Sequence, residues 1–115
     1  MPRELKTLPA AIREVLEAAA ARVRTRFGDR VVAVRLYGSQ ARGDAGPGSD
    51  VDILVVLDRI RDAADRLAAM GCVIDVGLER DLLLEPMVLD AEDLAWRRRC
   101  ETSLVRAIDE EGIAA

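Results

Sequence analysis

Hydrophobic residues recur at every third or fourth position near the start of the chain, and this spacing predicts an amphipathic helix over residues 8–27. The apolar positions are Leu8, Ile12, Val15, Leu16, Ala19, Val23 and Phe27. Thr7 is a suitable N-cap, Pro9 suits the first turn, and Gly28 is typical of the residue that ends a helix. The charged residues of this segment fall mostly off the apolar stripe, so we interpret them as a solvated helix face.

Three short segments rich in β-branched and apolar residues predict strands. They are Val31–Tyr37, Val51–Leu57 and Cys72–Leu78. Helical spacing over Asp58–Met70, ended by Gly71, predicts a helix between the second and third strands. The segment Val51–Leu57 is apolar on both faces, which indicates a strand in the middle of a sheet.

The pattern is weaker after the predicted third strand. Leu82–Leu89 is consistent with a short strand or with an irregular connector. Asp90 begins a helix-start signal for a short helix to about Arg97, and a last helix is predicted over Glu101–Glu111, ended by Gly112. This alternation predicts an α/β (α+β) fold, in which helices pack on a small mixed sheet of three to four strands.

The length of 115 residues fits one domain over residues 1–115, and the lack of histidine limits its chemistry. Without histidine there is no Ser-His-Asp or Cys-His catalysis, and most zinc and haem sites are excluded. Cys72 and Cys100 form no Cys-x-x-Cys pattern and are expected to be buried free thiols. Any reaction must therefore use carboxylates, hydroxyls, basic side chains and a bound metal.

The net charge of −4 is unevenly divided along the chain. Residues 1–49 contain nine Lys/Arg and five Asp/Glu, whereas residues 50–115 contain eight and sixteen. The basic first part could attract an anionic ligand such as a nucleotide, but the acidic whole argues against general nucleic-acid binding. Arg97-Arg98-Arg99 is interpreted as a solvated, salt-bridged face, because consecutive helical residues point in different directions.

The sequence contains no apolar run of the roughly 20 residues needed to span a bilayer, and no membrane association is expected. The N-terminal residues 1–6 lack the apolar core of a signal peptide. A cytoplasmic location is therefore expected.

The candidate chemistry lies around a Gly-Ser turn and a pair of aspartates. Gly38-Ser39 follows the first predicted strand, and after ten residues Asp50-Val51-Asp52 begins the next strand. Since side chains alternate along a strand, Asp50 and Asp52 project to the same side. Two carboxylates so close repel each other unless a cation lies between them, and Mg²⁺ prefers oxygen ligands together with the phosphates of a nucleotide. A Gly-Ser turn supplies N–H groups and a hydroxyl for phosphate, so the pattern predicts a metal–nucleotide site.

This arrangement resembles the nucleotidyltransferase superfamily of DNA polymerase beta, which is marked by Gly-Ser, about ten residues, and Asp-x-Asp. The following Ala41-Arg42-Gly43 makes the chain most similar to the minimal nucleotidyltransferases, many of which resemble antitoxins paired with HEPN-domain toxins. The motif covers roughly residues 34–57. The resemblance implies a nucleotidyltransferase core like the polymerase beta palm, with Mg²⁺ as a two-ion cofactor and ATP as the nucleotide.

The resemblance also implies a third metal-binding aspartate on a later strand, and Asp75 in the predicted strand Cys72–Leu78 occupies the matching position. A carboxylate among apolar neighbours needs a partner, so the alternative is a structural salt bridge, for example to Arg35. We predict Asp50, Asp52 and Asp75 as catalytic metal ligands in a two-metal mechanism. Gly38, Ser39 and Arg42 are predicted as nucleotide-binding residues; a solvent-facing structural role is the alternative for Arg42.

The first functional hypothesis is Mg²⁺-dependent transfer of a nucleoside monophosphate, AMP from ATP, to a hydroxyl. The resemblance suggests a HEPN-type toxin as acceptor, which would make the chain an antitoxin. A non-catalytic partner that neutralises a toxin by contact alone is the second hypothesis, with the apolar residues 82–89 as its candidate surface. Antibiotic adenylylation is a third, although no added substrate domain is evident. A homo-oligomer is compatible with the sequence, which does not set the oligomeric state.

Overall fold

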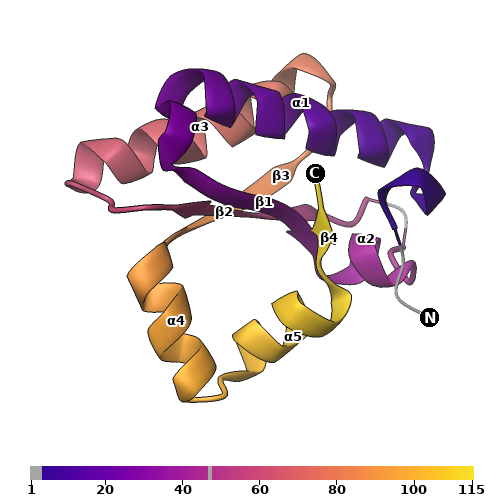
Figure 1. The fold of residues 1–115 in the computed structure, drawn as a ribbon. Coiled ribbons are helices and arrows are strands. Elements are labelled where there is room, and N and C mark those ends of the chain that lie inside the picture. Colours follow the sequence, from indigo (N-terminus) through magenta and orange to yellow (C-terminus); the bar gives the residue numbers. More distant parts are fainter. Residues whose placement is uncertain (1–3, 47) are drawn as a thin grey trace.

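The computed structural model describes residues 4–46 and 48–115 and contains a four-stranded sheet with helices on both faces (Figure 1). Residues 1–3, part of the predicted polar N-terminus, and Pro47, within the predicted loop 43–49, lie outside the described residues. The elements in chain order are η1 (Leu5–Thr7), α1 (Ala10–Phe27), η2 (Gly28–Arg30), β1 (Val31–Tyr37), α2 (Ser39–Arg42), β2 (Val51–Leu57), α3 (Ala63–Glu79), β3 (Leu84–Asp90), α4 (Ala91–Arg99), α5 (Ser103–Glu111) and β4 (Ile113–Ala114).

The strands are in the order β3-β2-β1-β4, and the sheet is mixed, as the sequence predicted. Strand β1 is antiparallel to β2 and to β4, whereas β2 and β3 are parallel and are joined through α3. In this register Tyr37 of β1 lies opposite Asp52 of β2, and Asp52 lies beside Glu85 of β3. Three polar side chains from three strands therefore form one row across the sheet.

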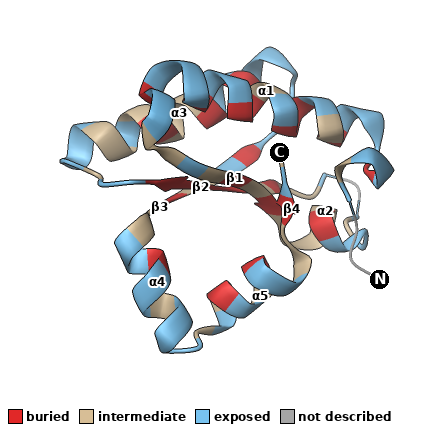
Figure 2. Cartoon of the chain, viewed as in Figure 1, coloured by how far each residue is buried: buried red, intermediate tan, exposed pale blue. Residues whose placement is uncertain are grey.

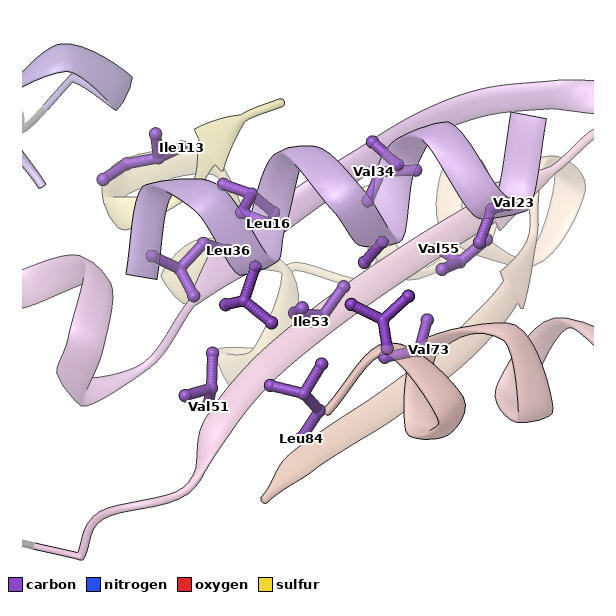
Figure 3. Close-up of a cluster of buried hydrophobic side chains, with 14 of the residues drawn as sticks. Leu16, Val23, Val34, Leu36, Val51, Ile53, Val55, Val73, Leu84 and Ile113 are labelled. Carbon is purple, nitrogen blue, oxygen red and sulfur yellow. The ribbon is translucent and has the colours of Figure 1, made fainter. Parts of the chain in front are cut away.

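The larger part of the core lies between the sheet and the pair α1 and α3 (Figure 1, Figure 2). Alternate residues of β2 face this layer, because Val51, Ile53 and Val55 belong to its cluster together with Leu16 of α1 and Val73 of α3 (Figure 3). These side chains are almost fully buried. Burial of such aliphatic side chains, at about 25 cal/mol per Å² of apolar surface, fixes the central strand that carries the aspartates.

The opposite face of the sheet is covered by the smaller helices α4 and α5 (Figure 1). Leu54 and Val56 of β2 pack there against Leu94 of α4 and Ile108 of α5. Side chains two residues apart on a strand point to the same face of the sheet. Asp52 therefore shares with Leu54 the face that α4 and α5 cover.

The segment predicted as a third strand, Cys72–Leu78, is instead the second half of α3. Its buried residues Ala69, Val73 and Val76 recur at helical rather than alternating spacing, and Gly71, predicted to end the helix, lies within it. The strand prediction is therefore wrong. The third long strand is β3, in the segment for which the sequence left strand and connector open.

The other elements agree closely with the sequence. Strands Val31–Tyr37 and Val51–Leu57 have the predicted bounds, and the first and the two C-terminal helices are present. The N-cap of α1 is Pro9, since Thr7 belongs to the preceding 3₁₀ turn. Cys72 and Cys100 are free, as expected, but neither is buried: Cys72 is half-buried and Cys100 is exposed.

Trp96 of α4 is 57% exposed, because Leu94 is the residue of that helix that enters the core. Within the part of the chain that the structure describes, no helix is long and apolar enough to cross a membrane.

Candidate active site

The turn between β1 and α2 brings the backbone against a carboxylate. Gly38 has φ +78°, a conformation that residues with a Cβ rarely adopt, and it precedes the first residue of α2, Ser39. A Cβ atom at Gly38 would lie 2.4 Å from Oδ2 of Asp52. Glycine is therefore required twice, once by the backbone angle and once by the space that Asp52 occupies.

Asp50 directly precedes β2 and Asp52 is its second residue, and both are half-buried. The strand begins with Val51, whose N–H donates to the carbonyl of Leu83 at 3.1 Å, so the loop before β3 and the head of β2 are held together. Partial burial raises the pKa of Asp52, a hydrogen bond with Glu85 lowers it, and the charge of Asp50 raises it again. The net direction of the pKa shift is upward.

Glu85 is the third carboxylate of this cluster. It lies beside Asp52 in the parallel register and is exposed. Hydrogen bonding with Asp50, the negative charges of Asp50 and Asp52, and desolvation raise the pKa of Glu85, because its protonated form is the more favourable neighbour for two carboxylates. Glu85 was not among the site residues predicted from the sequence; the available signal was its position as an acidic residue within the apolar run Leu82–Leu89.

Asp75 lies elsewhere, on the exposed side of α3. Helix α3 covers the face of the sheet opposite to Asp52, and the charge of Asp75 acts instead on Arg22 and Cys72. The prediction that Asp75 lies beside Asp50 and Asp52 is therefore wrong, because residues 72–78 form a helix and not the predicted strand. The alternative partner Arg35 approaches Asp109, at 3.9 Å.

Tyr37 completes the row of polar side chains. Its half-buried phenol lies on β1 opposite Asp52. Burial raises the pKa of Tyr37, and the charges of Asp52 and Glu85 raise it further. The phenol is therefore a neutral hydroxyl next to the carboxylate cluster.

Arg42, at the end of α2, is engaged in two ion pairs. Its Nε lies 3.0 Å from Oδ2 of Asp44 and its Nη1 lies 3.1 Å from Oε2 of Glu111. Its positive charge also lowers the pKa of Asp52, as the weakest of the four effects on that group. The charge of the guanidinium thus acts on Asp52, and Arg42 also has the structural contacts that the sequence left as the alternative.

The loop between α2 and β2 is tied to the same helix. Nε2 of Gln40 donates to the carbonyl of Ser49 at 3.5 Å, and the carbonyl of Ser39 accepts from the N–H groups of Gly43 and Asp44. These contacts place the turn at Gly38 and Ser39 next to the head of β2, so the residues of the motif form one local site.

Comparison with known proteins shows to which family this site belongs. A family profile described as a nucleotidyltransferase domain matches residues 16–111, which is most of the chain. The chain belongs to the nucleotidyltransferase domain family. The resemblance to the minimal nucleotidyltransferases of the polymerase beta-like superfamily is confirmed.

Individual nucleotidyltransferase relatives agree with this assignment. A Methanocaldococcus jannaschii protein, provisionally named a protein adenylyltransferase, is 24% identical over 100 residues, which are 87% of this chain and 94% of that protein. A solved structure of a Sulfolobus solfataricus protein, provisionally named a nucleotidyltransferase, matches 90% of this chain and 81% of its own, with a TM-score of 0.58 and 21% identity. A crystal structure of a toxin–antitoxin with AMP-PNP matches 85% of this chain and 70% of its own, with a TM-score of 0.56 and 19% identity. The two structures show that the fold is shared.

The carboxylates of this nucleotidyltransferase suit a hard cation but do not enclose one. Among residues 4–46 and 48–115, no set of three or more Cys, Asp or Glu side chains is already gathered as a metal site. Mg²⁺ typically binds through one or two carboxylates together with water and substrate phosphates, rather than in a cage made of protein alone. Burial and the charge of Asp50 raise the pKa of Asp52, and the neighbouring carboxylates raise that of Glu85. A bound cation would favour the charged form of both groups, so the donor set fits Mg²⁺.

Proposed function

We propose that this nucleotidyltransferase transfers AMP from ATP to a hydroxyl group of a partner protein, with Mg²⁺ held by Asp50, Asp52 and Glu85. The observation that carries the proposal is the grouping of these three carboxylates beside the Gly38-Ser39 turn. Bound Mg²⁺ would neutralise the phosphates and lower the pKa of the attacking hydroxyl. Since three carboxylates bring three negative charges, the site is suited to two divalent ions.

The remaining residues of the motif would bind and orient the nucleotide. Gly38 lets the backbone come close, and the hydroxyl of Ser39 at the start of α2 is available to donate to a phosphate oxygen. Arg42 adds a positive charge at the other end of the same short helix. In the transfer, the acceptor hydroxyl gives up its proton to solvent and its oxygen bonds to the α-phosphorus. The bond from that phosphorus to the oxygen bridging to the β-phosphorus breaks, and pyrophosphate leaves.

A protein as acceptor is supported by two of the comparisons. The Methanocaldococcus jannaschii relative is provisionally named a protein adenylyltransferase, and one structural neighbour is a toxin–antitoxin with AMP-PNP. Together with the resemblance to minimal nucleotidyltransferases, these names favour ATP as donor and a HEPN-type toxin as acceptor. The chain would then be the antitoxin of the pair.

Label transfer tests the reaction. Purified protein and Mg²⁺ are incubated with ATP labelled at the α- or the γ-phosphate, together with a lysate that contains the cognate toxin. We expect a labelled, protease-sensitive band from the α-label and none from the γ-label, since a kinase would give the opposite pattern. The matched control is the variant Asp50→Ala/Asp52→Ala, which should give no band. Absence of α-label transfer by the wild type in the presence of its partner would overturn the proposal.

Inhibition by contact alone is the second candidate, and exposed leucines favour it. Leu78 and Leu83 are 73% and 67% exposed and, with Asp81 and Leu82, line a hollow of about 290 Å³ after α3. Met87, Val88 and Leu89, also considered for such a surface, are instead at least partly buried in β3. Co-expression of the toxin with the Asp50→Ala/Asp52→Ala variant separates the two functions, because an antitoxin that acts by contact would still protect the cells.

A further inference from the structure

An ion pair connects the nucleotide-binding turn to the C-terminal helix. Arg42, the last residue of α2, and Glu111, the last residue of α5, are joined at 3.1 Å although 69 positions separate them in the sequence. Asp44 holds the same guanidinium at Nε, at 3.0 Å. Two carboxylates from different parts of the chain therefore fix one guanidinium plane.

Glu111 is itself firmly placed. Its side chain is 27% exposed, and it lies between Ile108 and Ile113, both of which are buried in the core. After Gly112 the chain enters β4, which pairs with β1. A Cβ atom at Gly112 would lie 2.3 Å from the carbonyl oxygen of Ile108, so the turn after Glu111 is tight. The carboxylate is thus presented from a segment that the core and the pairing of β4 with β1 hold in place.

The guanidinium of Arg42 has further N–H donors that a ligand could use. Arginine has five N–H donors, of which the two ion pairs use Nε and Nη1. Among the described residues no hydrogen bond engages Nη2. A free arginine would lose about 2 kcal/mol of side-chain entropy when it is fixed on a phosphate, and a pre-oriented one avoids most of that loss.

We propose that Glu111, with Asp44, is a positioning residue that orients Arg42 toward the triphosphate of the bound nucleotide. The proposal rests on the proposed function, because it assigns Arg42 to the nucleotide. It makes the C-terminal helix part of the nucleotide-binding apparatus, although Glu111 itself repels phosphate. In the competing arrangement Glu111 holds Arg42 away from the nucleotide, and this ion pair has to break before Arg42 can bind a phosphate.

Equilibrium binding of α,β-methylene-ATP with Mg²⁺, measured by calorimetry, separates these arrangements without any transfer reaction. Glu111→Gln should weaken binding roughly tenfold, the low end of the losses that follow removal of an orienting partner. Glu110→Gln is the matched control: it removes the same charge one position away, from an exposed residue. We expect this control to bind within about twofold of the wild type, because long-range charge effects are screened.

A double-mutant cycle with Arg42→Gln makes the test specific. If Glu111 acts through Arg42, adding Glu111→Gln to Arg42→Gln should change binding by less than about twofold. Asp44→Asn, at an exposed loop position, should also weaken binding and provides a second variant if Glu111→Gln does not fold. Circular dichroism melting verifies folding of each variant.

Tighter or unchanged nucleotide binding by Glu111→Gln relative to Glu110→Gln would overturn the positioning role. So would a loss of affinity on adding Glu111→Gln to Arg42→Gln that equals the loss in the wild-type background. Absence of binding by the wild type would be a different result: it would overturn the proposed function, and this inference with it.

Discussion

At the scale of single residues, the site depends on how closely the backbone of Gly38 approaches Asp52. The space that a Cβ would need is occupied by the carboxylate oxygen, 2.4 Å away. The turn and the aspartate are therefore one unit, and a side chain at residue 38 would displace the carboxylate even if its backbone angle were tolerated. Glycine at this position therefore preserves the geometry of Asp52.

Glu85 and Asp75 provide a matched pair of substitutions. We expect Glu85→Gln to reduce nucleotide transfer at least about a hundredfold, a typical loss for removal of one preorganised charged group. Asp75→Asn should leave transfer within about twofold of the wild type, because this exposed residue of α3 faces away from the carboxylate cluster. The α-label assay measures both. The reverse result would restore Asp75 as the third ligand.

The two aspartates and the glycine–serine turn could be predicted because their spacing is local in the sequence. The third carboxylate could not, since its position depends on which segment pairs with β2. An acidic residue between apolar ones occurs both at Asp75 and at Glu85. Only the parallel pairing of β2 and β3 decides between them.

At the scale of elements, α3 shows why the segment Cys72–Leu78 was assigned to a strand. Its apolar and β-branched residues suit both conformations, and Gly71 suggested a helix end. In the structure Gly71 lies within α3 with nothing within 4 Å of a Cβ, so it interrupts no packing. Packing of Val73 and Val76 on the core outweighs the weak helix propensity of glycine. The helix at 10–27 and the strands β1 and β2 were predictable because periodicity and end signals agree there.

Gly71→Ala tests the continuity of α3. We expect the variant to be more stable by about 1 kcal/mol, because alanine is the better helix former and open space surrounds the position. The midpoint of thermal unfolding, followed by circular dichroism, should rise by about 4 °C. Gly77→Ala is the contrasting variant and should lower the midpoint, since its Cβ would lie 2.6 Å from the carbonyl oxygen of Leu82. A fall on Gly71→Ala would mean that the helix ends before residue 71.

At the scale of the whole molecule, the two faces of the sheet differ in core size and in charge. The face under α1 and α3 holds most of the aliphatic core, whereas the face under α4 and α5 carries the carboxylates at its edge. Substitutions on the first face should act mainly on stability. The second face combines a smaller core with a cluster of like charges, so its stability should respond to pH and to cations.

The pH dependence follows from the raised pKa values of Asp52 and Glu85. Because these groups bind protons more tightly in the folded than in the unfolded state, their contribution to stability is complete below about pH 4 and is lost as pH rises through the raised values. Without divalent ions, Asp52→Asn should therefore melt with the wild type at pH 4 and about 2–4 °C above it at pH 7. Millimolar Mg²⁺ should raise the melting temperature of the wild type more than that of the variant.

Circular dichroism melting over this pH range, with and without Mg²⁺, provides the measurement. A constant difference between Asp52→Asn and the wild type from pH 4 to 7 would contradict the raised pKa of Asp52. Equal stabilisation of both proteins by Mg²⁺ would contradict the assignment of Asp52 as a ligand.

The exposed position of Trp96 on α4 has a practical consequence for all such experiments. It is the single tryptophan of the chain and is already 57% exposed in the folded protein, so unfolding will change its emission only slightly. Intrinsic tryptophan fluorescence is consequently a poor probe of the folding of this protein. The same indole becomes a built-in optical sensor of contact, because a protein that covers α4 would move a solvated fluorophore into an apolar setting and shift its emission to shorter wavelength.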